Sequence, residues 1–270
     1  MAIYERFSSN PRSWYVWVFD RLRLHGASRV LELGCGTGAL WSRNLDRLPK
    51  RCWVVLSDLS IPMLLDARRT LGVSKERFKW LAADAEALPF ADTSFDHVTA
   101  DHMLYHVRSL EKTLGEIRRV LRPDGRLFAS TNGRDHMREL WQLVARFDPE
   151  INAPGDTLGA HMRFPLETGA AILSRYFAMV ETHQYDNVLV VTEAEPVVGY
   201  VLSTSRGQRL MANEQRVAKF REFVQGHLRM NGPMRITTSS GLFEAHRPKG
   251  QSPISREVVA RESGAQQEIG

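Results

Sequence analysis

A short apolar stretch that ends beside an acid and runs straight into three alternating glycines most constrains how this chain folds. Residues 29–33 read as a β-strand with Glu32 near its end, and Gly34, Gly36 and Gly38 follow at once. Glycine lets the backbone take positive φ and approach a ligand closely, and a helix that follows presents free N–H groups at its start. The sequence therefore predicts a strand, a tight turn and a helix that together hold a nucleotide-like ligand.

Two kinds of ligand fit such a turn. The spacing Gly34-x-Gly36-x-x-Ala39 satisfies the dinucleotide fingerprint, and Asp58 lies at a suitable distance downstream to hold a ribose. Glu32 favours a different ligand, because a carboxylate at the mouth of the turn would repel a pyrophosphate and attract positive charge. S-adenosylmethionine (SAM), which has a sulfonium, an ammonium and no phosphate, meets that requirement.

The pattern Glu32-x-Gly34-x-Gly36-x-Gly38 resembles the first motif of the class I SAM-dependent methyltransferases, in the branch of the ubiquinone and menaquinone methyltransferases. Later family landmarks follow in order at residues 54–60, 83–90, 94–98 and 121–127. The resemblance covers about residues 28–133, and the rest of the chain follows the family only in outline. It implies an α/β fold with a doubly wound, seven-stranded, mostly parallel sheet, Rossmann-like, with helical lid insertions.

The resemblance also assigns the cofactor contacts. Asp58 would hold the ribose hydroxyls, and Asp84 with the Ala85 N–H would read the adenine edge. Each acid has a structural alternative, since Asp58 could serve a helix N-terminus and Asp84 could cap a turn. Leu59 and Met63 would sandwich the adenine or else belong to the core. The full expected set is Glu32, Gly34, Cys35, Gly36, Gly38, Asp58, Leu59, Met63, Asp84, Ala85 and Ala100.

Residues 100–106 follow the fourth expected strand and are the candidates for chemistry, because ligands bind at the carboxyl ends of parallel strands. We expect His106 to act as a base or orienting group, with His102 and Tyr105 as the other catalytic candidates. Either histidine could instead be a hydrogen-bonded structural residue. His102 and His106 have a metal-ligand spacing, but Met103 stands where a zinc hydrolase needs glutamate, so we expect no metal.

Aromatic and polar residues outside these motifs are candidates for acceptor binding. The expected set is Trp14, Tyr15, Asn132, His136, His183 and Tyr185. The aromatic residues of the N-terminal helix could equally pack that helix onto a lid, and polar residues at strand ends are often loop anchors. Arg12 is one of several arginines that could hold the SAM carboxylate.

Apolar runs alternate with amphipathic segments through the first half of the chain. We expect strands at 29–33, 53–57, 78–82, 95–100 and 126–131, with helices at 10–25, 37–48, 61–71 and 109–121. Later helices are expected at 135–147, 166–176, 193–203 and 208–229, and strands at 180–185 and 234–245. The expected organisation is a helical cap at 1–28, a SAM-binding methyltransferase domain at 29–247 with lid helices near 135–147 and 193–229, and a flexible tail at 248–270.

Composition excludes several other classes. The chain has 270 residues with 43% hydrophobic content, and its net charge of +5 comes from basic residues interleaved with acids. Because a nucleic-acid binder concentrates its positive charge, we expect a small-molecule partner and no nucleic acid. No leader pattern or long apolar run is present, so we expect no membrane association and a cytoplasmic location, with Cys35 and Cys52 as free thiols. The oligomeric state stays open.

The sequence thus predicts transfer of a methyl group from SAM to a small, aromatic or heteroaromatic metabolite, on carbon, nitrogen or oxygen, with S-adenosylhomocysteine as the second product. Small-molecule biosynthesis, including the tailoring of secondary metabolites, is the expected setting. The alternatives are an RNA methyltransferase, an NAD-dependent oxidoreductase, and a protein that binds SAM without catalysing transfer.

Overall fold

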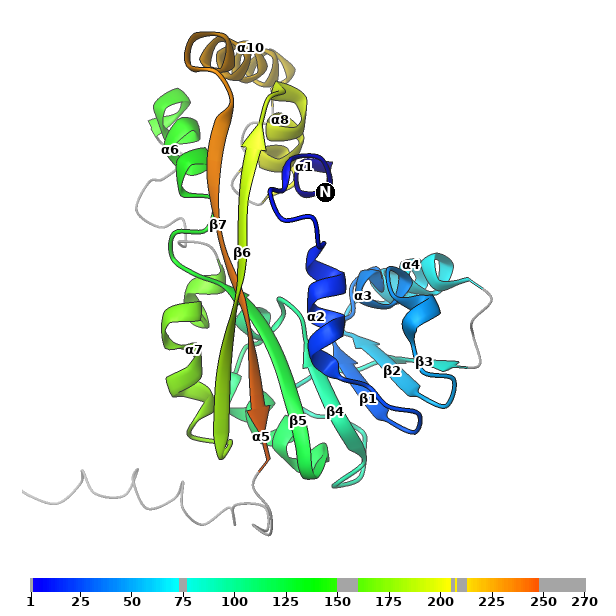
Figure 1. The fold of residues 1–270 in the computed structure, drawn as a ribbon. Coiled ribbons are helices and arrows are strands. Elements are labelled where there is room, and N and C mark those ends of the chain that lie inside the picture. The colour runs from blue at the N-terminus through cyan, green and yellow to red at the C-terminus, as the bar shows by residue number, and fades with distance from the viewer. Residues whose placement is uncertain (1, 73–76, 150–159, 205–206, 208–212, 248–270) are drawn as a thin grey trace, which may run out of the picture.

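The computed structural model describes residues 2–72, 77–149, 160–204, 207 and 213–247. The expected tail at 248–270 lies outside these residues. Seven strands form one sheet in the order β3-β2-β1-β4-β5-β7-β6 (Figure 1). The strands are β1 Arg29–Leu33, β2 Trp53–Asp58, β3 Phe78–Ala82, β4 Phe95–Ala100, β5 Leu121–Asn132, β6 Met179–Val191 and β7 Met234–His246.

Strands β1 to β5 pair in parallel, and only β7 runs against its neighbours β5 and β6. The expected seven-stranded, mostly parallel sheet is therefore confirmed. Successive side chains of a strand point to opposite faces, so a parallel strand that is covered on both faces must be apolar throughout. In β1, Val30 joins the core on one face and Leu31 the core on the other.

Helices cover both faces of the sheet. Helices α2 Trp14–Leu22, α3 Ala39–Ser42 and α4 Ile61–Leu71 pack on the Val30 face, whereas α5 Leu110–Val120 and α7 Leu166–Leu173 pack on the Leu31 face. This arrangement leaves the carboxyl ends of β1, β2 and β4 together at one edge. The chemistry expected of a doubly wound sheet belongs at that edge.

The hairpin of β6 and β7 extends beyond the other strands, and helices surround its far end (Figure 1). These helices are α1 Ala2–Phe7, α6 Arg138–Phe147, α8 Ala194–Leu202 and α10 Glu214–Asn231. Together with the hairpin residues Leu189, Val191 and Ile236, they form a further core, distinct from the cores on the two faces of the main sheet. Within residues 1–28, α1 joins the core around the far end of the hairpin, while α2 packs on the main sheet.

Several elements differ from the sequence expectation. The expected helix 37–48 is only the short α3 followed by a 3₁₀ turn, η1 Leu45–Arg47, and the side chain of Asn44 donates to the carbonyl of Leu40 at the break. Helix α1 was not expected, and its Ile3 and Phe7 are buried on one side at helical spacing. Two further 3₁₀ turns among the described residues are η3 Leu104–His106 and η5 Ala160–Arg163.

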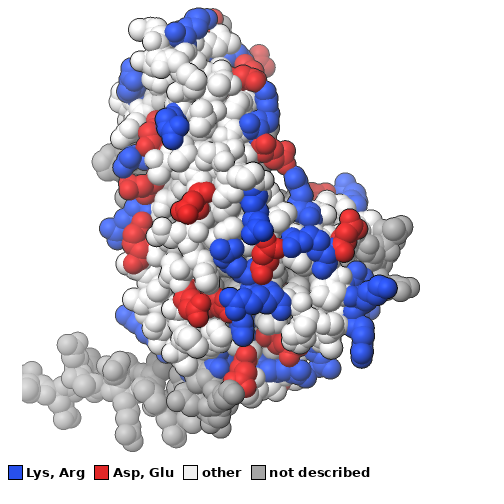
Figure 2. All heavy atoms as spheres, viewed as in Figure 1, with Lys and Arg blue, Asp and Glu red and all other residues white. Residues whose placement is uncertain are grey.

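Charge is dispersed on the face of the molecule that Figure 2 shows. In the view of Figure 2, lysines and arginines alternate with acids and form no single-sign stripe. Cys35 and Cys52 are buried free thiols. Among the described helices, none combines the length and the apolar character that crossing a membrane requires.

Candidate functional site

The glycine turn lies at the carboxyl end of β1 and has the backbone that its sequence predicts. Gly34, Gly36 and Gly38 have φ of 63°, 52° and 73°, a region that glycine enters without steric cost. The N–H of Cys35 donates to the carbonyl of Ser57 over 2.9 Å, which ties the turn to β2. A Cβ atom on Gly34 would lie 2.8 Å from the Cβ of Met103, so the turn also packs directly against the segment that follows β4.

Glu32 differs from the expected open anionic rim. Its side chain is buried, and its Oε2 accepts a hydrogen bond of 2.6 Å from the indole Nε1 of Trp41. Burial raises the pKa of Glu32 to about 8, the Trp41 hydrogen bond acts in the opposite direction, and the nearby carboxylates of Asp101 and Asp58 raise it further. At neutral pH the ligand-free side chain therefore holds its proton, and a cation is needed to ionise it.

Asp58, at the end of β2, binds the glycine turn itself. Its Oδ2 accepts from the N–H of Gly36 over 2.9 Å, and its Oδ1 accepts from the N–H of Ser60 over 2.8 Å. A carboxylate has about four acceptor positions, so room remains for two ribose hydroxyls. Leu59 and Met63 are 74% and 43% exposed, which excludes the alternative that they are core residues.

Asp84 caps a turn after β3, as its structural alternative proposed. Its Oδ1 accepts from the N–H of Glu86 over 2.9 Å, and its Oδ2 forms an ion pair of 2.8 Å with Arg108. Arg108 is highly exposed, so this pair can open. Ala85 is buried beside it. The adenine role of Asp84 and Ala85 stays a prediction.

The carboxyl end of β4 carries a group that the sequence reading only partly identified. The carboxylate of Asp101 accepts from the hydroxyl of Ser130 and from the indole Nε1 of Trp14, the latter over 3.1 Å. Ser130 Oγ also accepts from the N–H of His102 over 2.9 Å. His102 has a φ of 53°, a left-handed conformation that costs energy in a residue other than glycine and marks a constrained position.

The three catalytic candidates lie in different environments. Burial lowers the pKa of His102 and Asp101 opposes this, and the ring Nδ1 is buried without a hydrogen-bond partner among the described residues. His106 is exposed, although desolvation and the neighbouring His102 lower its pKa. Tyr105 lies between them with ring centroids 6.4 Å and 4.6 Å away, and burial raises the pKa of its hydroxyl.

An aromatic wall stands beside His102. The ring of Trp14 lies 5.1 Å from that of His102 and 5.3 Å from that of Tyr185, and Trp17 stacks on Trp14. The Tyr185 hydroxyl donates to the backbone carbonyl of Arg12 over 2.5 Å. These contacts connect α2, β4 and β6, so the N-terminal helix covers the edge at which β4 ends.

Tyr15 shares the electrostatic environment of this edge. Burial raises its pKa to about 12, with further contributions from the carboxylates of Asp101 and Glu32. Arg12 forms an ion pair of 3.0 Å with Asp20.

The remaining acceptor candidates form two separate groups. Asn132 and His136 meet at the hydroxyl of Ser240, and His136 Nε2 lies 3.0 Å from the Tyr4 hydroxyl. His183 lies apart from them, with its Nε2 near the carboxylates of Glu181 and Glu244. The structure therefore does not bring His183 together with the other candidates, and the acceptor roles of all six stay predictions.

A hollow of about 440 Å³ lies at the opposite edge of the sheet. Its lining includes Arg23, His97, Arg122 and Arg126, from the amino ends of β4 and β5 and the loops around them. Because ligands of doubly wound sheets bind at the carboxyl ends of the strands, this hollow is not the expected cofactor site.

Sequence reasoning assigned no individual role to three residues of the site, although Asp101 lies within the segment 100–106 that it singled out. Asp101 directly follows β4, a position that could have identified it in the same way as Asp58 after β2. Ser130 lies 29 residues from Asp101, and Trp41, the partner of Glu32, lies in the next helix, so neither hydrogen bond leaves a pattern within a single strand or helix.

Comparisons with known proteins match the part of the chain that holds β1 to β4 and most of the site described above. Residues 31–129 match the family model "Methyltransferase domain". The chain is 38% identical over 118 residues to the ubiquinone/menaquinone biosynthesis C-methyltransferase UbiE of Paracoccus denitrificans, covering 43% of this chain and 47% of that protein. It is 36% identical over 135 residues to the malonyl-[acyl-carrier protein] O-methyltransferase of Erwinia pyrifoliae, covering 49% of each.

A solved structure extends the comparison to the fold. A putative methyltransferase from an antibiotic biosynthesis pathway of Anabaena variabilis aligns with a TM-score of 0.59 at 19% identity, over 85% of this chain and 96% of that one. At this identity the match concerns the fold alone. The chain spans about half the length of the curated relatives that it matches. The family model, rather than any one relative, places the match on the residues that carry the glycine turn and β4.

Proposed function

Because residues 31–129 identify this chain as carrying a class I SAM-dependent methyltransferase domain, a domain whose cofactor is SAM, we propose that it transfers the SAM methyl group to a small, ring-bearing metabolite. One observation carries the proposal. At the end of β4, His102 has a ring nitrogen with no hydrogen-bond partner among the described residues, and it lies against Trp14, next to Met103, which packs on the glycine turn. This arrangement combines a proton acceptor, an aromatic surface and the proposed cofactor turn at one edge.

The cofactor half of the proposal rests on Glu32, Asp58 and the glycine turn. Glu32 ionises against the ammonium of SAM, Asp58 accepts from the ribose hydroxyls, and the exposed Leu59 and Met63 cover the adenine faces. Gly34 and Gly36 let the backbone approach the amino-acid part of SAM. This set favours a phosphate-free cation over a dinucleotide, because a pyrophosphate would keep Glu32 protonated and unused.

The acceptor half rests on the surroundings of His102. Its pKa is lowered by burial, so the imidazole is neutral at physiological pH and can accept a proton. The acceptor atom attacks the methyl carbon, the bond from carbon to sulfur breaks, and the proton of the acceptor passes to His102. The product pair is the methylated acceptor and S-adenosylhomocysteine. Asp101, adjacent in the chain, stabilises the imidazolium that forms.

The magnitudes rank the contributions of alignment and base catalysis. Holding the nucleophile, methyl and sulfur in line contributes up to roughly 7–11 kcal/mol, whereas a general base contributes on the order of 10²–10⁴-fold. Trp14, which is only partly buried and stacks on Trp17, supports a flat, apolar acceptor, since aromatic faces stack in this way. We therefore favour a quinol-like or phenolic ring as the acceptor over a malonyl thioester.

The test has two stages. Calorimetry with SAM, S-adenosylhomocysteine and NAD measures the cofactor preference, and transfer of labelled methyl from SAM to a panel of hydroquinones, phenols and a malonyl thioester measures the acceptor class. We expect SAM binding, no NAD binding and labelled hydroquinones or phenols. Binding of NAD in preference to SAM would overturn the cofactor assignment, and labelling of the thioester alone would overturn the acceptor class.

His102→Gln and His106→Gln form the matched pair for the base. We expect His102→Gln to lower turnover on the order of 10²–10⁴-fold while SAM affinity stays within a few-fold, with a smaller effect for His106→Gln because that ring is exposed. Equal losses in the two variants, or a loss explained by SAM affinity alone, would remove His102 from its role.

A further inference from the structure

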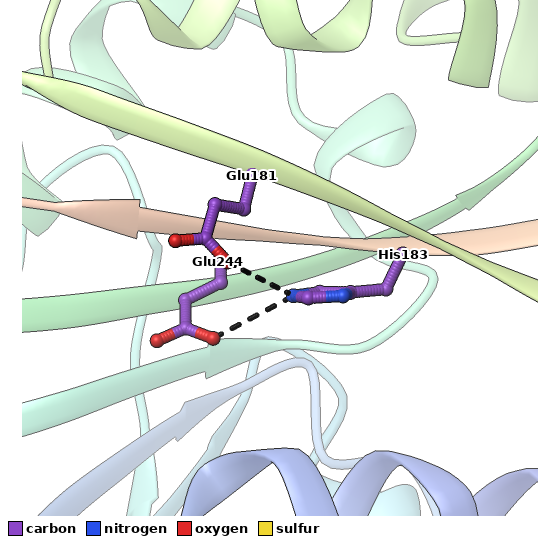
Figure 3. A group of neighbouring side chains, drawn as sticks. All are labelled: Glu181, His183 and Glu244. Carbon is purple, nitrogen blue, oxygen red and sulfur yellow. Dashed lines mark ion pairs between the residues drawn. The ribbon is translucent and has the colours of Figure 1, made fainter.

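Three side chains meet on the face of the β6–β7 hairpin, away from the edge described above (Figure 3). Glu181 and Glu244 are directly paired across the two strands, and His183 stands two residues further along β6 on the same face. Nε2 of His183 lies 3.8 Å from an oxygen of Glu181 and 3.6 Å from Oε2 of Glu244. One ligand atom from each residue lies within 4.8 Å of the others.

Two of these three donor atoms lack hydrogen bonds within the described chain. Glu244 is 1% exposed, and its Oε2 is buried without a hydrogen-bond partner. Nε2 of His183 is also a buried atom without a hydrogen-bond partner, and it faces Oε2 of Glu244. A buried polar atom without a hydrogen bond costs about 1–3 kcal/mol, so two such atoms aimed at one point indicate a missing partner.

We propose that Glu181, His183 and Glu244 bind one divalent transition-metal ion of the zinc class. An imidazole nitrogen with two carboxylate oxygens suits zinc and its first-row neighbours, whereas magnesium and calcium prefer oxygen ligands only. Tetrahedral zinc with bonds of about 2.0–2.1 Å sets its ligand atoms about 3.3 Å apart. The two distances from His183, 3.6 and 3.8 Å, exceed that value by less than an ångström, and the two carboxylate oxygens lie within 4.8 Å of each other, so binding requires the side chains to draw together.

The cationic side chains around Glu244 define what the ion must compete with. Arg126 donates to Oε1 of Glu244 over 2.8 Å, which leaves Oε2 for the ion and holds the carboxylate in place, as hydrogen bonds to metal ligands commonly do. His246 also lies near Oε1, at 3.4 Å. Arg23 lies 3.7 Å from Oε2 but is 61% exposed, so it can move aside. Burial lowers the pKa of the Arg21 guanidinium, and the negative charge of Glu244 opposes this shift.

The site is separate from the proposed methyl transfer. Along β5, Glu244 pairs with Phe128, four residues before Asn132 at the carboxyl edge, a distance of about 13 Å at 3.3 Å per residue. Glu181 is half exposed, and the hollow at the opposite edge borders Arg23 and Arg126, so an ion has a route from solvent. Bound there, the ion joins β6 to β7 and stabilises the hairpin.

The test uses the untagged full chain and does not involve methyl transfer. Calorimetry with ZnCl₂, the visible absorption of bound Co²⁺, and thermal melting with and without zinc are compared for the native chain, Glu181→Gln and His183→Gln. His227→Gln, in α10 at the far end of the hairpin, is the matched histidine control. We expect one ion per chain, at least about tenfold weaker binding in both ligand variants and unchanged binding in the control.

Arg23→Gln gives an independent check of the position of the ion. Removing a cation near Oε2 of Glu244 is expected to tighten zinc binding several-fold, because like charges repel. Failure of the native chain to bind zinc, binding that His183→Gln does not weaken, or equal binding of Mg²⁺ would each overturn the proposal. None of these outcomes bears on SAM binding, so the two proposals fail separately.

Discussion

Replacing Glu32 by Gln separates the folding role of this side chain from its proposed cofactor role, because the two respond in opposite directions. The substitution keeps size and shape and leaves an oxygen to accept from Trp41, but it removes the ionisable proton. Burial raises the pKa of Glu32 from 4.5 to about 8. Between these values the folded chain binds one proton that the unfolded chain has lost, so stability falls as the pH rises through this window.

The size of the folding effect follows from the shift. At 1.36 kcal/mol per pKa unit, Glu32 lowers the free energy of unfolding by roughly 4 kcal/mol at pH 7.5, relative to a side chain that does not titrate. We therefore expect Glu32→Gln to be more stable than the native chain at pH 7.5, by up to about 4 kcal/mol, and to differ little at pH 4.5. Urea denaturation at the two pH values measures the difference.

The affinity for SAM should be lower in Glu32→Gln than in the native chain, although the variant is more stable. With a pKa of about 8, roughly nine-tenths of Glu32 is protonated at pH 7, so binding a cation that ionises it releases close to one proton. Calorimetry of SAM in buffers of different ionisation enthalpy counts that proton. We expect its release in the native chain, no such release from residue 32 in Glu32→Gln, and SAM affinity about 10- to 100-fold weaker in the variant, since a hydrogen bond to a charged group is worth about 1.5–3 kcal/mol.

Comparing the variant with the native chain also removes the titration of SAM itself, which is common to both. The reasoning is refuted if Glu32→Gln is destabilised at pH 7.5, or if both proteins bind SAM with the same affinity and the same proton release. The first result would mean that folding does not raise the pKa of Glu32, and the second that the cofactor does not reach its carboxylate.

Two further predictions concern other parts of the molecule. Gly34→Ala should destabilise the chain more than Gly36→Ala. Both residues have positive φ, which costs alanine about 1–2 kcal/mol, but only a Cβ at residue 34 would meet Met103, at 2.8 Å, which costs about 1–3 kcal/mol more. Denaturation of the two variants measures the difference in their free energies of unfolding. Burial lowers the pKa of His97 to about 4, so the unfolded chain takes up a proton first as the pH falls below 6.5, and stability is lost between 6.5 and 4. Between pH 7.5 and 4.5, the free energy of unfolding of His97→Leu should therefore fall by about 2–3 kcal/mol less than that of the native chain. Equal losses of stability for the two proteins, measured by melting at the two pH values, would contradict this.

Much of the fold was predictable from local patterns. The expected strands 29–33, 78–82 and 95–100 and the helix 61–71 match their observed bounds. These are elements whose apolar periodicity and flanking residues agree, such as Ser60, whose hydroxyl accepts from the N–H of Met63 at the start of α4. Strand β6 extends well past its expected end at 185, because its far half is covered by α8 and by α1, elements distant in sequence.

The candidate site was predictable to a similar extent. The glycine turn and Asp58 could be found because each directly follows an apolar strand. The burial of Glu32 could not, since it depends on the packing of Trp41 and of neighbouring elements over the carboxylate. The pair of Trp14 and Asp101 joins residues 87 positions apart, and no spacing rule covers such a contact.

The amino-acid sequence alone determined the alternation of strands and helices, the positive-φ turn after β1 and the edge of the sheet at which chemistry belongs, because these follow from periodicity and from the backbone freedom of glycine. Only the tertiary structure decided that Glu32 is buried with a raised pKa, that α2 closes over His102, and that Glu181, His183 and Glu244 share one point. Burial and proximity between distant segments arise from packing, and packing sets both the charge of a side chain and the partners that it can reach.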